Sequence, residues 1–152
     1  MESFEETYES RYKKTSEDCL YLNVWVPETA LKVGGFPIVV VLSGEDSYDW
    51  STNKVSGLDM AAEGIIVVTI QYRSNVFGWL TMDNPLSPGN LGMKDQLMAF
   101  EWIEENVSKF GGDLKKVTLL GHGQMGVFNS FYHLLLPKTK SKNHELNLNH
   151  LN

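Results

Sequence analysis

The stretch Val117-Thr-Leu-Leu-Gly-His-Gly-Gln-Met-Gly126 decides the predicted fold. Its first four residues are apolar or β-branched, as is typical of a strand, and three closely spaced glycines then indicate a turn. Residues Val127–Leu136 follow with the composition of a helix, which Pro137 ends. The stretch therefore predicts a strand, a glycine-rich turn and a helix in direct succession.

The segments before this stretch also alternate between strands and helices. Ile38–Leu42 and Ile65–Tyr72 are almost continuously apolar, which is typical of strands covered on both faces. Leu91–Phe110 has most of its apolar residues on one face of a helix and ends at Gly111-Gly112. The other predicted segments are a strand over Leu20–Val26, a helix over Val55–Ala62, and loops over Lys32–Pro37 and Arg73–Gly89. This alternation predicts an α/β fold with a mostly parallel sheet covered by helices.

Composition limits the class of protein. The 152 residues carry a formal net charge of −6 and are 42% hydrophobic, which suits one acidic globular domain and argues against global disorder. No basic stripe offsets the acidic balance, so we expect no nucleic-acid partner. The longest apolar run is too short to cross a bilayer, and the acidic N-terminus does not resemble a secretory signal. The single cysteine, Cys19, has no partner for an internal disulfide.

A glycine-rich turn between a strand and a helix can serve several chemistries. A phosphate-binding loop would need Lys followed by Ser or Thr, and the turn contains neither. The Gly-x-Gly-x-x-Gly spacing of Gly121–Gly126 is compatible with a dinucleotide fingerprint, but it lies late in the chain and no ribose-binding acid follows it. The third possibility is a nucleophile elbow, Gly-x-Ser-x-Gly, in which the central residue stands on a strained turn above the sheet.

The surrounding sequence resembles the type-B carboxylesterase and cholinesterase family. The resemblance covers roughly residues 16–136, with its motifs in the family's order. These motifs are Ser16-Glu-Asp-Cys-Leu-Tyr-Leu-Asn-Val-Trp-Val-Pro27, Asn75-Val-Phe-Gly-Trp-Leu80, Pro88-Gly-Asn-Leu-Gly-Met-Lys-Asp-Gln96, Ala99-Phe-Glu-Trp102, Asn106, Phe110-Gly-Gly-Asp113 and Val117-Thr-Leu-Leu-Gly121. The resemblance implies a partial α/β-hydrolase fold that lacks the family's C-terminal half. The predicted organisation is an N-terminal extension over residues 1–15, a partial hydrolase domain over 16–137 and a tail over 138–152. The tail is predicted to be disordered because its polar composition shows no usable period.

The resemblance places the family's nucleophilic serine at position 123, where this chain has glycine. The expected elbow is therefore degenerate, because Gly123 has no side chain that could attack a carbonyl carbon. Met125 also stands where the next flanking glycine belongs, although Gly126 follows it. Ser130 is not expected to substitute, since it lies two turns into the helix. The degenerate elbow consists of Gly121, His122, Gly123, Gln124 and Met125.

The oxyanion loop is also expected to be degenerate. The family follows the strand equivalent to Ile38–Leu42 with His and a run of glycines, whose N–H groups stabilise a developing oxyanion. This chain has Ser43, Gly44, Glu45 and Asp46 instead, and so places two carboxylates where negative charge would develop. A like charge about 4 Å away would oppose that charge by roughly 1 kcal/mol in water and by more in a dry cleft.

The catalytic acid and histidine of the family come from its large C-terminal half. In this chain the histidines of the tail, His144 and His150, have no neighbour expected to orient them. We therefore expect no catalytic residue, and we also expect no cofactor and no metal. The chain corresponds to about the first third of a larger hydrolase.

Four further positions match the family's pattern. Cys19 matches a cysteine that pairs with an upstream partner, and a free thiol is an equal alternative. Glu17 and Arg73 match a buried ion pair. Asn106-Val-Ser108 is a formal glycosylation sequon, but its place inside a helix favours a structural role for Asn106.

The predicted function is that of a catalytically inactive relative, a pseudo-carboxylesterase. It resembles the family's adhesion members, of the neurotactin, glutactin and neuroligin type, and would act in protein recognition or cell adhesion. Two alternatives stay open, a degraded copy of an ester-hydrolysing carboxylesterase and a non-functional truncated product. The acidic-aromatic loop around Trp50 could contact a protein partner, and an uncovered edge at Val117–Leu120 would favour self-association. The resemblance implies an extracellular or membrane-attached location.

Overall fold

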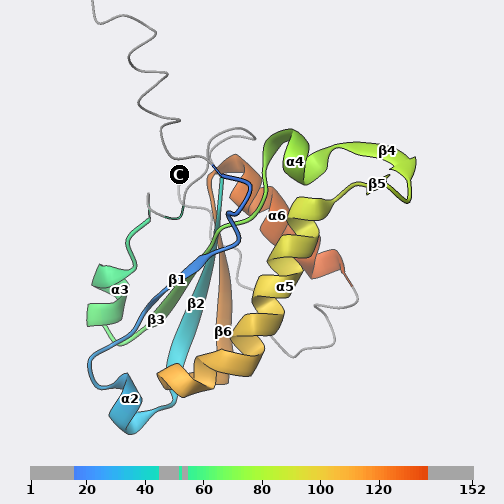
Figure 1. Cartoon of the computed structure of the whole chain (residues 1–152). Helices are drawn as coiled ribbons and strands as arrows, with labels where there is room; N and C mark the ends of the chain where they lie inside the picture. Colours follow the sequence, from blue (N-terminus) through green and yellow to red (C-terminus); the bar gives the residue numbers. More distant parts are fainter. Residues whose placement is uncertain (1–15, 45–51, 53–54, 137–152) are drawn as a thin grey trace, which may run out of the picture.

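A computed structural model of the chain describes residues 16–44, 52 and 55–136, and a four-stranded sheet forms its centre (Figure 1). The strands lie in the order β1-β3-β2-β6. Strand β2 pairs in parallel with β3 and with β6, whereas β1 is antiparallel to β3. Their bounds are Leu22–Trp25 for β1, Phe36–Ser43 for β2, Ile66–Ile70 for β3 and Gly112–His122 for β6. The predicted mostly parallel α/β sheet is confirmed.

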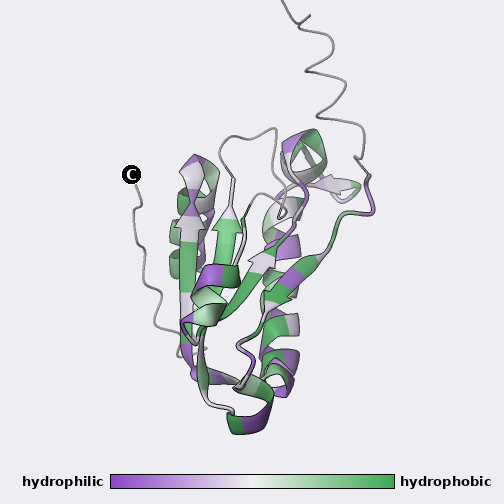
Figure 2. Cartoon of the chain, turned by 90° about the vertical axis from the view of Figure 1, so that its left-hand side faces the viewer, coloured by the Kyte–Doolittle hydropathy of each residue, from purple (hydrophilic) through white to green (hydrophobic). Residues whose placement is uncertain are grey.

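Helices cover both faces of this sheet. The short helix α3 lies on one face, and the longer helices α5 and α6 lie on the other (Figures 1 and 2). The helices are α2 over Ala30–Val33, α3 over Leu58–Ala62, α4 over Asn75–Trp79, α5 over Leu91–Asn106 and α6 over Gly123–Leu135. A 3₁₀ turn, η2, continues α5 over Val107–Phe110. Figure 2 shows that the strands carry the most continuous hydrophobic runs of the chain.

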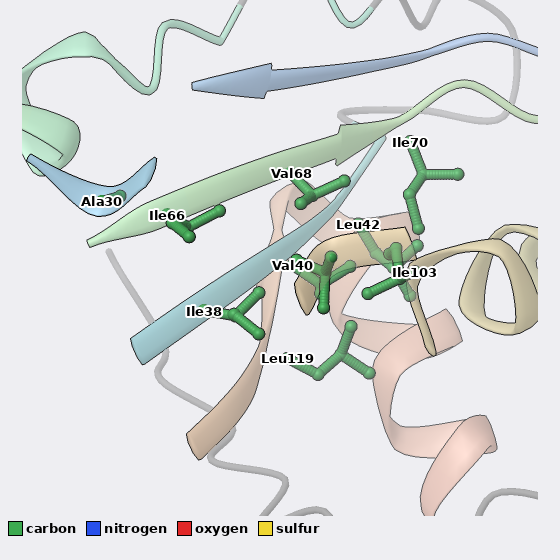
Figure 3. Packing of buried hydrophobic residues seen from close by; sticks show 10 residues of the cluster. Ala30, Ile38, Val40, Leu42, Ile66, Val68, Ile70, Ile103 and Leu119 are labelled. Carbon is green, nitrogen blue, oxygen red and sulfur yellow. The ribbon is translucent and has the colours of Figure 1, made fainter. Parts of the chain in front are cut away.

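The main core lies between the sheet and α5. Its side chains come from alternate positions of the strands, because successive residues of a strand point to opposite faces. Figure 3 shows Val40, Leu42 and Leu119 converging on Ile103 of α5. The buried cluster consists of Ala30, Ile38, Val40, Leu42, Ile66, Val68, Ile70, Ile103, Val107 and Leu119.

The register between β2 and β6 places the candidate site. These parallel strands run side by side from Ile38↔Val117 to Ser43↔His122. Their carboxyl ends therefore meet at the same end of the sheet, where the turn into α6 begins.

The chain differs from the sequence prediction mainly in its connections. The predicted loop Arg73–Gly89 contains α4 and a small hairpin of β4, Thr81–Asn84, and β5, Ser87–Pro88. The Asn84 side chain stabilises the turn of this hairpin, because its Oδ1 accepts the backbone N–H groups of Leu86 and Ser87. The predicted loop over Lys32–Pro37 contains the end of α2 and the start of β2.

The largest differences in element boundaries concern β6, α6 and α5. Strand β6 begins at Gly112, because Gly112 already pairs with Phe36 across an irregularity in the ladder. Helix α6 begins at Gly123 rather than at Val127, so the glycine-rich turn supplies its first residues. Helix α5 ends at Asn106, and the rest of the predicted helix is the 3₁₀ turn.

Candidate functional site

The predicted elbow is the junction between β6 and α6. His122 ends the strand in an extended conformation, and Gly123 begins the helix with φ of +71°. L-residues rarely adopt this left-handed region, and a side chain there would be strained by roughly 1–2 kcal/mol. The backbone at Gly123 thus has the strained form that a nucleophile elbow requires.

Two glycines allow α6 to start close to the sheet. A Cβ on Gly126 would lie 2.3 Å from the carbonyl oxygen of Leu42 in β2. A Cβ on Gly121 would lie 2.8 Å from the Cα of Val127. Both contacts are with backbone atoms and are shorter than any side chain tolerates, so these positions require glycine. Gly126, and not residue 125, therefore supplies the clearance on the helix side of the turn.

The segment after β2 contacts the elbow directly. The Gly44 N–H donates to the carbonyl oxygen of His122 at 3.0 Å, and the Met125 N–H donates to the Gly44 carbonyl oxygen at 2.9 Å. The Ser43 hydroxyl lies 3.0 Å from Nδ1 of His122. The structure therefore brings together Ser43 and Gly44 of the predicted oxyanion loop with His122 and Met125 of the predicted elbow. Glu45, Asp46 and Trp50 lie outside the described residues.

Buried hydrogen bonds connect the end of β2 to α6 through the Tyr72 side chain. The Tyr72 hydroxyl donates to the Ser43 carbonyl oxygen at 2.9 Å, and the Asn129 amide donates to the same hydroxyl at 3.1 Å. Burial raises the pKa of Tyr72 to about 12, so the phenol stays protonated and remains a donor. Sequence reasoning missed Tyr72 and Asn129, although Tyr72 is the last residue of a predicted strand.

Ser130 lies two turns into α6 from Gly123 and is fully buried. Its hydroxyl donates to the Gly126 carbonyl oxygen at 2.8 Å, within the same helix. This bond occupies the hydroxyl proton within α6. Ser130 therefore lies where the sequence predicted, in the helix interior.

Sequence reasoning also missed His133, which follows the elbow in α6. The side chain is fully buried, with Nε2 2.8 Å from the Gln96 side-chain oxygen and its ring edge-on to Phe100. Burial lowers the pKa of His133 to about 4. Its spacing from Gly126 and Ser130, four and then three residues, is the signal that could have placed it on the buried face. The tail histidines His144 and His150 lie outside the described residues.

The predicted ion pair between Glu17 and Arg73 is wrong. Arg73 instead binds Asp95 of α5 through two side-chain contacts of 2.7 Å, and its backbone N–H also donates to this carboxylate. Glu17 is exposed, whereas Asp95 is buried and follows Arg73 by 22 residues. The bidentate geometry of a guanidinium and a carboxylate explains why Arg73 takes this partner.

Cys19 and Asn106 are the two other positions that match the family's pattern. Cys19 is a half-buried free thiol, and burial, followed by the negative charge of Asp95, raises its pKa. The Asn106 amide donates to the Trp102 carbonyl oxygen at 2.8 Å, and its oxygen accepts the Lys109 ammonium. These bonds close the end of α5 and support the structural role that the sequence favoured for Asn106.

The described ranges 16–44, 52 and 55–136 hold no group of three side chains suited to a metal ion. In the same part of the chain, no helix combines the length and apolarity needed to cross a bilayer.

Comparison with known proteins places the chain in a family. Residues 2–146 match the family described as "Carboxylesterase family". The chain is 39% identical over 137 residues to "Acetylcholinesterase 1" of Caenorhabditis elegans, covering 83% of this chain and 21% of that protein. It is 39% identical over 132 residues to "Liver carboxylesterase 1" of Oryctolagus cuniculus, covering 86% of this chain and 23% of that protein. It is also 38% identical over 133 residues to "Crystal protein" of Dictyostelium discoideum, covering 86% and 24%.

The chain thus spans about a quarter or less of the length of these relatives. The matched region includes the whole described sheet and the turn into α6. The family match, the parallel sheet and the glycine-flanked turn agree, and the chain belongs to the carboxylesterase family.

Proposed function

We propose that this chain is a non-hydrolytic member of the carboxylesterase family whose role is to recognise another protein, as in cell adhesion. The observation that carries the proposal is Gly123. It occupies the strained first position of α6, directly after the sheet, and it brings no side chain to that position. Ester hydrolysis by this family's route needs a nucleophilic side chain there.

The neighbouring serines support the proposal, because neither is placed to replace the missing nucleophile. Ser43 forms a Ser–His contact with His122, which by itself resembles an activated hydroxyl. However, Ser43 is fully buried, so a substrate carbonyl carbon cannot reach its oxygen. Ser130 is equally buried and is bonded within its own helix.

The contacts of Gly44 add further support. Its carbonyl oxygen accepts the first N–H groups of α6 from Met125 and Gly126, at 2.9 and 3.4 Å. Its own N–H is bonded to His122. The Gly44 N–H group is therefore already occupied and is not available to stabilise an oxyanion.

The main alternative is an ester-hydrolysing carboxylesterase, and the names of two relatives favour it. Acetylcholinesterase 1 and Liver carboxylesterase 1 carry the names of enzymes. The narrower resemblance to adhesion members of the neurotactin, glutactin and neuroligin type therefore rests on the degenerate elbow. A recognition role suits an extracellular or membrane-attached location, which we propose with it. A non-functional product is the third possibility.

Hydrolysis of p-nitrophenyl acetate tests the catalytic half of the proposal. The unmodified chain should release p-nitrophenol no faster than buffer, and a serine-directed organophosphate should change nothing. Gly123→Ser should be no more active than Gly123→Ala, which has the same backbone strain but no hydroxyl. Organophosphate-sensitive hydrolysis by the unmodified chain would overturn the proposal.

Binding of chain-coated beads to cells tests the recognition half. The beads should adhere to cells that present the partner, and replacing residues 45–50 by Gly and Ser should abolish adhesion. A matched replacement of surface residues in the β4–β5 hairpin should leave it intact. Failure of the unmodified chain to bind any cell type in a broad panel would favour the non-functional product.

A further inference from the structure

Two fully buried side-chain atoms have no hydrogen-bond partner within the described part of the chain. They are Nε2 of Gln96, which is a donor, and Oδ1 of Asn129, which is an acceptor. Folded proteins leave few such atoms unpaired, because removing a polar group from water without a hydrogen bond is costly. The two atoms have complementary chemistry and so indicate a bound group that serves both.

Three contacts bring Gln96 and Asn129 to the same buried region. They form a closed ring that joins the segment after β3 to α5, α5 to α6, and α6 back to the segment after β3. The three contacts are Arg73–Asp95, Gln96–His133 and Tyr72–Asn129. Asn129 and His133 are four residues apart on α6, so their side chains share one face, with about 5–6 Å between the Cβ atoms. Since Gln96 contacts His133 at 2.8 Å, it approaches α6 within one helical turn of Asn129.

The hydrogen bonds of this region all run in one direction. Burial lowers the pKa of His133 to about 4, so its ring is neutral near pH 7 and carries one proton. The Gln96 oxygen can only accept, so His133 donates to it through Nε2. Farther along, Asn129 donates to the Tyr72 hydroxyl, which donates to the Ser43 carbonyl oxygen. The series of donors is therefore interrupted at one point, between Gln96 and Asn129.

The group that joins the two parts of this series must accept from the Gln96 N–H and donate to the Asn129 oxygen. It must also be small, because both side chains are fully buried. A group from outside this chain could reach neither atom without displacing the residues that cover them. Water both accepts and donates, and a buried water in a protein typically makes about three hydrogen bonds to otherwise unpaired polar groups.

We propose that an ordered water molecule is bound between Nε2 of Gln96 and Oδ1 of Asn129 and joins α5 to α6. It completes a continuous series of hydrogen bonds from His133 to the Ser43 carbonyl oxygen at the end of β2. Reversing the Gln96 amide would leave two acceptor oxygens, to which one water molecule can donate both of its protons. The ligand is therefore the same in either orientation of the amide.

The bound water connects the helix pair to the candidate site. Ser43, which receives the last hydrogen bond of the series, also contacts His122 through its hydroxyl group. Hydrogen bonds linked in series polarise and strengthen one another. The water is thus a structural ligand that helps to hold α6, and the turn that begins it, against the end of β2.

Water-selective NMR on the full-length chain, labelled with nitrogen-15, tests the proposal without any substitution. The side-chain amide protons of Gln96 should show cross-peaks to water whose NOE and ROE have opposite signs. That pattern marks a water molecule held for longer than the tumbling time of the protein, and it excludes direct exchange of the amide protons. The exposed amide of Asn84 provides the comparison and should show only brief surface hydration.

Three variants identify the source of the signal. Tyr72→Phe and Ser130→Ala each remove a neighbouring hydroxyl group, whose proton exchanges with water and can relay the magnetisation. The Gln96 cross-peaks should survive in both variants. Asn129→Leu has a similar volume but no acceptor, and it should abolish the cross-peaks.

Stability measurements test the bridge by a second route. Gln96→Met and Asn129→Leu each remove one end of it, so the double variant should lower the urea midpoint by less than the sum of the two single shifts. Gln96→Met with Ser130→Ala is the matched control. Its shifts should add, because the Ser130 hydroxyl is bonded to Gly126 within α6. Additive shifts in both cycles would contradict the bridge.

Four NMR results would overturn the proposal. The first is a folded chain whose Gln96 amide protons show no cross-peak to long-lived water. The second is a scalar coupling across a direct hydrogen bond from the Gln96 nitrogen to the Asn129 side-chain carbonyl. The third is loss of the cross-peaks in folded Tyr72→Phe or Ser130→Ala. The fourth is an NOE from the Gln96 amide to residues 137–152, which would make that segment the partner.

Discussion

The hydroxyl of Ser43 lies 3.0 Å from Nδ1 of His122, and this contact joins the carboxyl ends of two neighbouring parallel strands. Both residues stand where the chain departs from the catalytic pattern it resembles. Ser43 begins the altered oxyanion loop, and His122 precedes the glycine at the nucleophile position. The two segments that depart from the catalytic pattern are therefore in contact with each other.

A double-mutant cycle should detect this contact. Ser43→Ala and His122→Ala should each destabilise the fold, with a coupling energy of about 1 kcal/mol, because the hydrogen bond needs both partners. Urea unfolding followed by tryptophan fluorescence measures it. Ser130→Ala is the matched control, since its hydroxyl is bonded within α6, and its cycle with His122→Ala should be additive. Additivity of both cycles would contradict the contact.

Gly126→Ala should destabilise the fold by about 3 kcal/mol or more, because the added Cβ would clash with the Leu42 carbonyl oxygen at 2.3 Å. Gly34→Ala provides the comparison. Gly34 has φ of +70° and ψ of 178°, with open space around its Cβ position, so the substitution should cost only backbone strain, about 1–3 kcal/mol, without a clash. Thermal unfolding by circular dichroism measures both variants. Similar losses would mean that α6 can shift away from β2.

Asp95→Asn should lower the free energy of unfolding by about 3 kcal/mol, because it leaves the Arg73 guanidinium without its bidentate carboxylate. Asp113→Asn is the matched control. Asp113 contacts Lys116 at the surface, where an ion pair contributes little to stability. Urea titration separates the two effects. An unchanged urea midpoint for Asp95→Asn would show that the Arg73–Asp95 ion pair does not stabilise the fold.

His133 should make the fold sensitive to acid. Its folded pKa of about 4 lies below the ordinary value of 6.5, because burial disfavours the charged ring. Between these two values the unfolded chain binds a proton that the folded chain does not. Stability should therefore be unaffected by His133 above pH 6.5 and should fall by roughly 3 kcal/mol as the pH decreases to 4.

His133→Gln should flatten this dependence on pH, as measured by urea unfolding at several pH values. His122→Gln keeps His133 and should leave the slope in place. A slope that is identical in the unmodified chain and in His133→Gln would assign the acid sensitivity to other groups.

The sequence predicted the parts of the fold that depend on local pattern. The buried runs around Val40 and Val68 identified β2 and β3, since strands covered on both faces are continuously apolar. The spacing of glycines identified the turn at Gly123. These features depend on neighbours along the chain, and a sequence displays such neighbours directly.

The missed features depend on contacts between distant segments. Arg73 could pair with any acidic residue by charge alone, and only the packing of α5 beside the loop after β3 selects Asp95. His133 and Gln96 meet because α5 and α6 lie side by side, which no local pattern displays. The start of β6 at Gly112 depends on its pairing with Phe36, and boundaries of this kind are set by the partner strand.

The crossing of α6 over β2 has a consequence for how the turn can vary. The geometry of the turn depends on clearance at Gly121 and Gly126, whereas its chemistry depends on the single residue between them, at position 123. A hydroxymethyl group at that position can be added or removed while the two flanking glycines keep the helix seated on the sheet. The two glycines therefore fix the backbone of the turn, whereas the side chain at position 123 can change without altering that backbone.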